Sequence, residues 1–193
     1  MKSILKTIAF ATVTLLMTSC GYNSMVEKDE SITEQWAQVE TQYQRRADLI
    51  PNLVSTVEGY ADFEKETLMG VIEARSKATS VQIDPSNLTE ENLATFQKAQ
   101  GQISSSLSKL LVTVERYPDL KANENFRDLQ AQLEGTENRI AVARRNFNES
   151  VKSYNTYIRK FPRNMYAGMF DFEKRAYFAA EEGNEKAPEV SFK

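Results

Sequence analysis

Apolar residues recur every seven positions along most of the chain. Between about residues 24 and 60 two such series run side by side, and one of them contains a charged residue, Arg46. The first series is Trp36, Tyr43, Ile50 and Val57, and the second is Ile32, Val39, Arg46, Leu53 and Tyr60. A strict seven-residue repeat keeps one seam of a helix against its partners and favours left-handed supercoiled packing. The pattern predicts a long first helix that ends near Gly59.

A second and a third helix are expected to follow. Asp62 is a suitable N-cap for a helix over about residues 62–78, because its carboxylate can accept a backbone N–H. The inward positions of this helix are Leu68, Val71, Ile72, Ala74 and Ala78. The third helix is expected to begin near Ser86 or Thr89 and to end at Pro118, which lacks an amide proton. Its two series are Phe96, Ile103, Leu110 and Tyr117, and Leu93, Gln100, Leu107 and Val114.

The fourth helix carries the longest periodic signal. Asn123 is its expected N-cap and Pro162 its expected end. Its series is Phe126, Leu133, Ile140, Phe147, Tyr154 and Phe161. Short connections between helices require antiparallel neighbours, and the first and fourth helices would each be roughly 55 Å long. The expected fold is all-α: an elongated antiparallel four-helix up-and-down bundle with a short C-terminal aromatic segment over about residues 161–178.

The first twenty residues have the pattern of a targeting segment. Two lysines precede an apolar run from Thr7 to Met17, which is shorter than the ~20 residues a membrane-spanning helix needs. The sequence Met17-Thr18-Ser19-Cys20 resembles the lipobox of bacterial lipoproteins. We expect residues 1–19 to be removed as a signal peptide and the thiol of Cys20 to carry diacylglycerol, which anchors the chain in a bilayer. The alternative is an uncleaved membrane anchor over residues 4–17.

Composition excludes several kinds of chemistry. The 193 residues include no His and one Cys, which rules out His-dependent catalytic sites, His metal sites and an internal disulfide. The net charge of −3 is unfavourable for binding nucleic acid. Carboxylates such as Glu134 and Glu137 are more typical of solvated helix faces than of acid–base pairs. We therefore expect no enzyme, no metal site and no cofactor.

Two polar stretches interrupt the helical pattern and are candidate binding surfaces. The first surrounds Arg46, whose seam position requires either a carboxylate partner or a side chain that extends outward to solvent. Arg46 lies roughly 20 Å along the rod from the first turn, so the expected partner is Glu134 or Glu137. The second stretch is the connector over residues 116–123 at the far pole. The candidate residues either fix helix register and the turn or contact a protein partner: Arg45, Arg46, Asp48, Asn52, Tyr117, Asp119, Lys121 and Asn123.

The same stretches carry a family resemblance. The motifs are Arg45-Arg46-Ala47-Asp48-Leu49-Ile50-Pro51-Asn52-Leu53-Val54, Gly59-Tyr60-Ala61, Tyr117-Pro118-Asp119-Leu120-Lys121-Ala122-Asn123, Leu129-Gln130, Glu134-Gly135-Thr136-Glu137 and Phe161-Pro162. Together they resemble the LemA family of bacterial proteins over about residues 24–178. The resemblance implies an antiparallel four-helix bundle behind a membrane-anchoring N-terminus, and it supplies no catalytic residues. Usual members begin with an uncleaved anchor helix, where this chain has a lipobox.

The expected organisation is a signal peptide over residues 1–19, a helical bundle domain over 20–180 and a polar flexible tail over 181–193. The expected function is a membrane-tethered, periplasm-facing scaffold or adaptor of the bacterial envelope. Its expected partners are the lipid bilayer, through N-terminal acylation, and another envelope protein. A self-assembling membrane-organising protein is the alternative and an enzyme the third choice, while homo-oligomerisation and the choice of inner or outer membrane stay open. The aromatic segment either covers the end of the bundle or enters the membrane interface.

Overall fold

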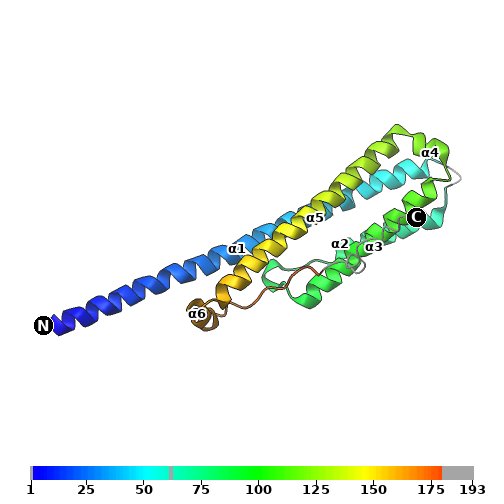
Figure 1. Ribbon diagram of the computed structural model, residues 1–193. Helices are drawn as coiled ribbons and strands as arrows, with labels where there is room; N and C mark the ends of the chain where they lie inside the picture. The colour runs from blue at the N-terminus through cyan, green and yellow to red at the C-terminus, as the bar shows by residue number, and fades with distance from the viewer. Residues whose placement is uncertain (1, 61–62, 180–193) are drawn as a thin grey trace, which may run out of the picture.

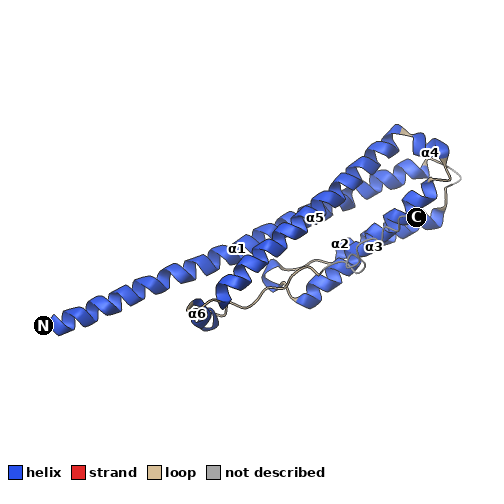
Figure 2. Ribbon diagram, in the orientation of Figure 1, coloured by secondary structure: helices blue, strands red, loops and turns tan. Residues whose placement is uncertain are grey.

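The computed structural model describes residues 2–60 and 63–179, with side chains from Gly21 onward. The elements, in order, are α1 (Lys2–Glu58), α2 (Lys65–Ser80), the 3-10 turn η1 (Pro85–Asn87), α3 (Glu90–Val114), α4 (Pro118–Ala122), α5 (Glu124–Arg159) and α6 (Arg163–Met169). Within these ranges there is no strand (Figure 2). The all-α prediction is confirmed.

The long helices run alternately up and down an elongated rod (Figure 1). α1 packs along α5, and α2 packs along α3. The turn after α1 lies with α4 at one end, which we call the distal pole. α6 lies near the other end, the N-terminal pole, where α1 continues beyond the remaining helices (Figure 1). The 36 residues of α5 correspond to roughly 54 Å, in agreement with the expected length.

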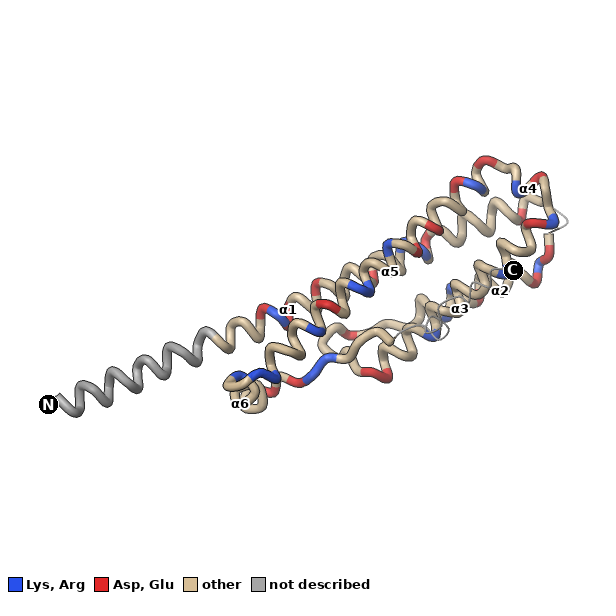
Figure 3. The backbone as a smooth tube through the Cα atoms, in the orientation of Figure 1, with Lys and Arg blue, Asp and Glu red and all other residues tan. Residues whose placement is uncertain are grey.

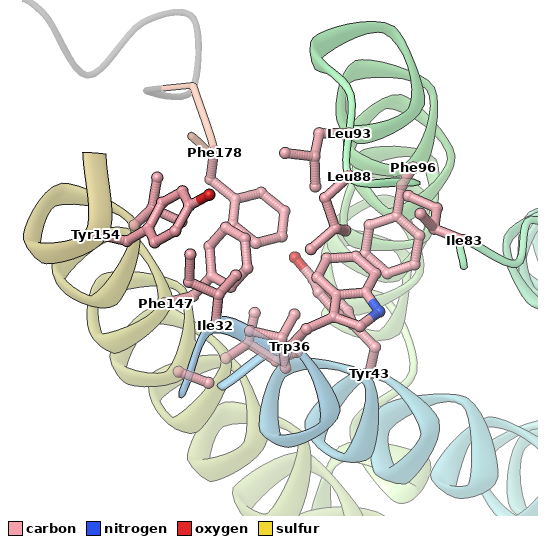
Figure 4. Packing of buried hydrophobic residues seen from close by; sticks show 14 of the residues in the cluster. Ile32, Trp36, Tyr43, Ile83, Leu88, Leu93, Phe96, Phe147, Tyr154 and Phe178 are labelled. Carbon is pink, nitrogen blue, oxygen red and sulfur yellow. The ribbon is translucent and has the colours of Figure 1, made fainter. Parts of the chain in front are cut away.

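The seven-residue series form the core. Their buried members are Ile32, Trp36, Val39, Tyr43, Arg46, Ile50, Leu53, Val57, Leu93, Phe96, Gln100, Ile103, Leu107, Leu110, Val114, Phe126, Leu133, Ile140, Phe147 and Tyr154. Aromatic rings fill the half near the N-terminal pole (Figure 4). The indole of Trp36 stacks on Phe178 with ring centroids 5.9 Å apart and meets Phe96 edge-on at 5.3 Å. The periodic residues thus pack against one another across the helices, as the repeat predicts.

The predicted N-cap Asn123 and the predicted helix start near Thr89 are confirmed. The Thr89 hydroxyl accepts the backbone N–H of Asn92 at 3.2 Å, and the Asn123 side-chain oxygen accepts that of Phe126 at 3.0 Å. Each cap satisfies a backbone donor that has no partner within the first helical turn. α3 therefore begins directly after Thr89, and α5 directly after Asn123.

Several predicted boundaries were wrong. α1 begins at Lys2 instead of near residue 24, because the apolar N-terminal run continues the same helix. α2 begins at Lys65, so Asp62, itself outside the described residues, is not its N-cap. Within α2 the expected inward residue Ile72 is 37% exposed, while Thr67 is buried. α3 ends at Val114 and Pro118 starts α4, since proline is well tolerated at the first helical position.

The end of α5 gives the largest difference from the heptad prediction. The series predicts an inward Phe161, but α5 ends at Arg159 and the Phe161 side chain is 80% exposed. Pro162 cannot donate the next helical hydrogen bond, and the chain turns into α6. The seam is closed instead by residues that follow α6.

Residues 172–179 return along the bundle and are held by side-chain amides of α5. The Asn155 amide donates to the Arg175 carbonyl at 2.9 Å and accepts the Arg175 N–H at 3.0 Å. Asn148 pairs in the same way with Phe178, at 3.1 and 2.9 Å. These two asparagines are seven residues apart and share one helix face. The buried ring of Phe178 then completes the aromatic core, so this part of the aromatic segment covers the bundle. The predicted flexible tail over 181–193 lies outside the described residues.

Candidate functional site

Arg46 is buried at the centre of the rod and connects three helices. Its side chain is 1% exposed. Nη1 donates to Ser104 Oγ at 2.9 Å and to Glu137 Oε1 at 2.7 Å. Nη2 donates to the Gln100 backbone oxygen at 3.0 Å and to its Oε1 at 2.7 Å. A guanidinium with fixed donor directions therefore sets the register of α1 against α3 and α5.

The ion pair agrees with the sequence prediction. Of the two carboxylates expected for Arg46, Glu137 is the partner, while Glu134 accepts a hydrogen bond from Gln130 at 3.0 Å. The Glu137 side chain remains 44% exposed, so water reaches one member of the pair. This lowers the desolvation cost that a fully buried ion pair would carry.

Pro51 leaves a carbonyl in α1 without its helical donor, and another helix supplies one. Proline has no N–H, so the carbonyl four residues earlier, that of Ala47, loses its usual partner. The Arg75 Nε of α2 donates to this oxygen at 2.7 Å. α1 continues through the proline as one helix. The motif around Pro51 therefore serves as an attachment point for α2.

A groove runs beside this buried network. It lies between α1, the end of α2 with its following loop, and α3, and has a volume of about 1010 Å³. Its lining includes the exposed residues Arg45, Asp48 and Asn52 and the buried Phe96 and Ile103. The groove thus combines an apolar floor with a polar rim, a composition suited to binding a ligand in a fixed orientation.

The charges of the rim are only partly paired within the chain. Asp48 accepts a hydrogen bond from the Gln44 side-chain amide at 2.7 Å. Partial burial raises the pKa of Glu40, another lining carboxyl, above its usual range. Throughout residues 21–60 and 63–179 no three His, Cys, Asp or Glu side chains are grouped as a metal site requires.

The distal connector is a separate cluster whose predicted residues mostly bond to their own chain. The Asn123 amide donates to the Tyr60 hydroxyl at 3.1 Å, and that hydroxyl lies 3.5 Å from the Asp119 backbone oxygen. Lys121 pairs with Glu115 at 2.6 Å, and the Tyr117 ring packs on Phe63 with centroids 5.0 Å apart. These contacts hold the connector against the turn that follows α1.

A second ion pair joins the connector to the start of α2. Arg116 lies 2.6 Å from Glu64 and holds the pKa of that carboxyl below its usual range. Both partners are largely exposed, so the pair adds little stability. The connector residues therefore hold the distal turn, and partner binding at this pole stays a prediction.

Three contributors were missed by sequence reasoning: Gln100, Ser104 and Arg75. Gln100 is the one polar residue in an otherwise apolar series, and pairing it with the other seam exception, Arg46, would have located the network. Arg75 carries no comparable signal, because it lies on the exposed face of a short helix in the sequence pattern. Its role depends on the distance between α1 and α2.

The N-terminal part of the site is described only through its backbone. Cys20 falls within α1, and its side chain lies outside the described residues. None of the helices in the described part of the chain is long and apolar enough to span a membrane.

Comparison with known proteins identifies the family. A family model described as "LemA family" matches residues 35–192. A protein named LemA from Metamycoplasma hominis is 27% identical, over 83% of this chain and 69% of that protein. A magnetosome protein named MamQ from Magnetospirillum gryphiswaldense is 28% identical, over 91% of this chain and 70% of that protein. MamQ 2 of Paramagnetospirillum magneticum is 26% identical with the same two coverages. Since the family model matches most of the chain, this protein belongs to the LemA family.

Proposed function

We propose that this protein is a membrane-tethered, periplasm-facing adaptor of the bacterial envelope, and that the groove beside Arg46 docks a segment of another envelope protein. Membership of the LemA family and similarity to the MamQ proteins support the coarser statement that it is a membrane-associated envelope protein. The observation that carries the finer proposal is the groove, with its apolar floor and charged rim on a register fixed by Arg46.

The dimensions of the groove fit a polypeptide segment. Its lining extends along α1 from Ala37 to Asn52, a length of roughly 22 Å. About seven residues of an extended chain span that distance. The apolar floor would bind side chains of the segment, and the rim amides and carboxylates would bind its backbone or its charges.

The tether is proposed at Cys20. The lipobox-like sequence Met17-Thr18-Ser19-Cys20 supports cleavage before the cysteine and acylation of its thiol. Because α1 runs through this position without interruption, a lipid at Cys20 would be joined directly to the rod. Docking would then take place at a fixed height above the bilayer.

Site-specific photocrosslinking in native membranes tests the adaptor proposal. A photoreactive residue at Gln44, on the groove rim, is expected to give one distinct adduct with another protein. The same residue at Val112, which is 72% exposed on α3, serves as the control and is expected to give none. Asp48→Lys should abolish the adduct from position 44, whereas Asp128→Lys on α5 should leave it unchanged.

The alternatives give different products. A ladder of self-adducts from position 44 would favour the self-assembling protein over the adaptor. Equal adducts from positions 44 and 112, or an adduct from 44 that survives Asp48→Lys, would contradict docking in the groove.

A further inference from the structure

The segment that follows α5 and forms α6 exposes a row of large apolar side chains. Phe161, Met165 and Met169 are spaced by four residues and are 80%, 63% and 72% exposed. The adjoining Phe170 is 50% exposed. We call these four residues the apolar ridge. Ala167, on the opposite side of α6, is 5% exposed and belongs to the core. α6 therefore has apolar residues on two sides: Ala167 packs on the core, and Met165 and Met169 are exposed to solvent.

The ridge is unusual for this molecule. Elsewhere among the described side chains the exposed large apolar residues lie singly or, on α2, as one pair: Met69 with Ile72, then Val112, Val142, Tyr22 and Tyr177. The ridge instead places four within ten residues of sequence, at the N-terminal pole. The ring of Tyr22 on α1 lies 5.0 Å from that of Phe170, so the ridge adjoins the helix that leads to Cys20. A cluster of this kind marks an interaction site, whereas single exposed apolar residues are ordinary.

Cations flank the ridge on one side. A groove of about 390 Å³ beside α6 is lined by Lys28, Lys152, Lys160 and Arg163, with Glu149 as its one carboxylate. The ring of Tyr157 holds the Arg163 guanidinium 4.0 Å from its centroid and the Lys28 ammonium at 5.4 Å.

The other side of α6 is also basic. Arg159 and Lys174 line a second groove of about 420 Å³ there. Among the described residues, no carboxylate lies within ion-pair distance of Lys152, Lys160 or Lys174. Two acidic residues, Asp171 and Glu173, occupy the loop that follows α6. Figure 3 shows basic positions around α6 where α5 ends and the chain returns.

We propose that the N-terminal pole rests on an anionic phospholipid surface, with the apolar ridge in the acyl boundary and the flanking cations at the lipid phosphates. An amphipathic helix with basic residues beside an apolar face binds such an interface through apolar burial and through attraction to anionic lipid. The whole chain carries a net charge of −3, so this attraction is a local property of the pole. The inference rests on the proposed membrane tether, which would bring this pole to the bilayer.

Fluorescence of a probe on the ridge tests the contact in the intact protein, purified with its membrane anchor and reconstituted in vesicles. Acylation of Cys20 removes the chain's one free thiol, so Met169→Cys supplies a unique site for an environment-sensitive dye. The control is Val112→Cys, since both side chains are 72% exposed. We expect a blue shift and quenching by lipid-borne nitroxide at position 169 in vesicles of phosphatidylcholine with phosphatidylglycerol. Position 112 should show neither.

The results separate this inference from the tether. If the protein floats with the vesicles but the dye at 169 behaves as in water, the ridge contact is refuted and the tether stands. If the unmodified chain reacts with the dye at Cys20, the proposed acylation fails. The ridge is then judged by the same measurement in the Cys20→Ala background.

Charge variants test the lipid chemistry. Lys160→Glu with Arg163→Glu should abolish the blue shift at 169 on anionic vesicles, and neutral vesicles should give only a small shift with either protein. Lys98→Glu with Lys109→Glu on α3 makes the same change in total charge and should have no effect. Equal shifts on neutral and anionic vesicles would contradict the role of the cations. A blue shift without lipid, at concentrations where the chain self-associates, would show that a second copy of the chain covers the apolar ridge. That result would contradict the lipid contact.

Discussion

Arg46 donates from one nitrogen to both oxygens of Gln100, at 2.7 Å to the side chain and at 3.0 Å to the backbone. These two residues are the polar exceptions in their respective apolar series, and each is the other's partner. Both are buried, so neither can be replaced alone without leaving a polar group unsatisfied. The pair thereby specifies one register of α1 against α3.

Arg46→Met should destabilise the fold by about 1–3 kcal/mol, because the Gln100 side chain loses its donor inside the core. Combining it with Gln100→Leu should cost less than the sum of the two single changes, since a matched apolar pair can replace a buried polar one. Urea unfolding of the two single variants and the double variant measures this coupling. The neighbouring exposed Arg45→Met is the control and should change the stability by about 0.5 kcal/mol or less. Additive effects of the two changes would contradict the proposed pairing.

Arg75→Met should cost about 1 kcal/mol, because the Ala47 carbonyl then has no donor. In a Pro51→Ala background the restored backbone N–H can donate to the Ala47 oxygen. Arg75→Met should then lower the free energy of unfolding by less. Comparing the two free-energy differences by urea unfolding separates the hydrogen bond from the packing of the Arg75 side chain. Equal costs in both backgrounds would show that the contact does not compensate for the proline.

Asn155→Ala should loosen residues 172–179, because it removes both hydrogen bonds to the Arg175 backbone. Hydrogen exchange should become faster at Arg175 and Phe178, and the free energy of unfolding should fall by about 1–3 kcal/mol. Asn146→Ala, at an exposed position of the same helix, is the matched control. Unchanged exchange in Asn155→Ala would contradict a role for these two hydrogen bonds in holding the segment.

Tyr154 predicts an alkaline loss of stability. Burial, with the charge of Asp29, raises the pKa of Tyr154 from 10.0 to about 12. The folded protein therefore holds this proton more tightly than the unfolded chain does, and the resulting stabilisation is complete below pH 10. It declines as the pH rises from about 10 towards 12. Tyr154→Phe should flatten the urea-unfolding profile in this interval, whereas the half-exposed Tyr177→Phe should not.

Periodicity was sufficient to predict the four long helices, because each buries a continuous apolar seam. It failed at Phe161, where the seven-residue count continues but the backbone does not. Pro118 shows a related limit, since proline can end one helix or begin another. The choice depends on the conformation of the preceding residues.

The sequence likewise predicted one part of the candidate site and missed another. The ion pair between Arg46 and Glu137 followed from counting residues along antiparallel rods, because both lie on straight helices. The groove between α1 and α3 and the donor from Arg75 depend on spacing between helices, which no single-chain pattern contains. The sequence predicted an aromatic segment where the apolar ridge lies. It did not predict which side chains are exposed, because that depends on the turn at Pro162.

The central claim is that a lipid at Cys20 holds this rod at a membrane. Mass spectrometry of the N-terminal peptide from the protein purified out of its own membrane tests it most directly. We expect the mature chain to begin at Cys20, with the mass of a diacylglyceryl thioether and a further acyl group on the new N-terminus. A chain that begins at Met1 and carries a free thiol at Cys20 would contradict the claim.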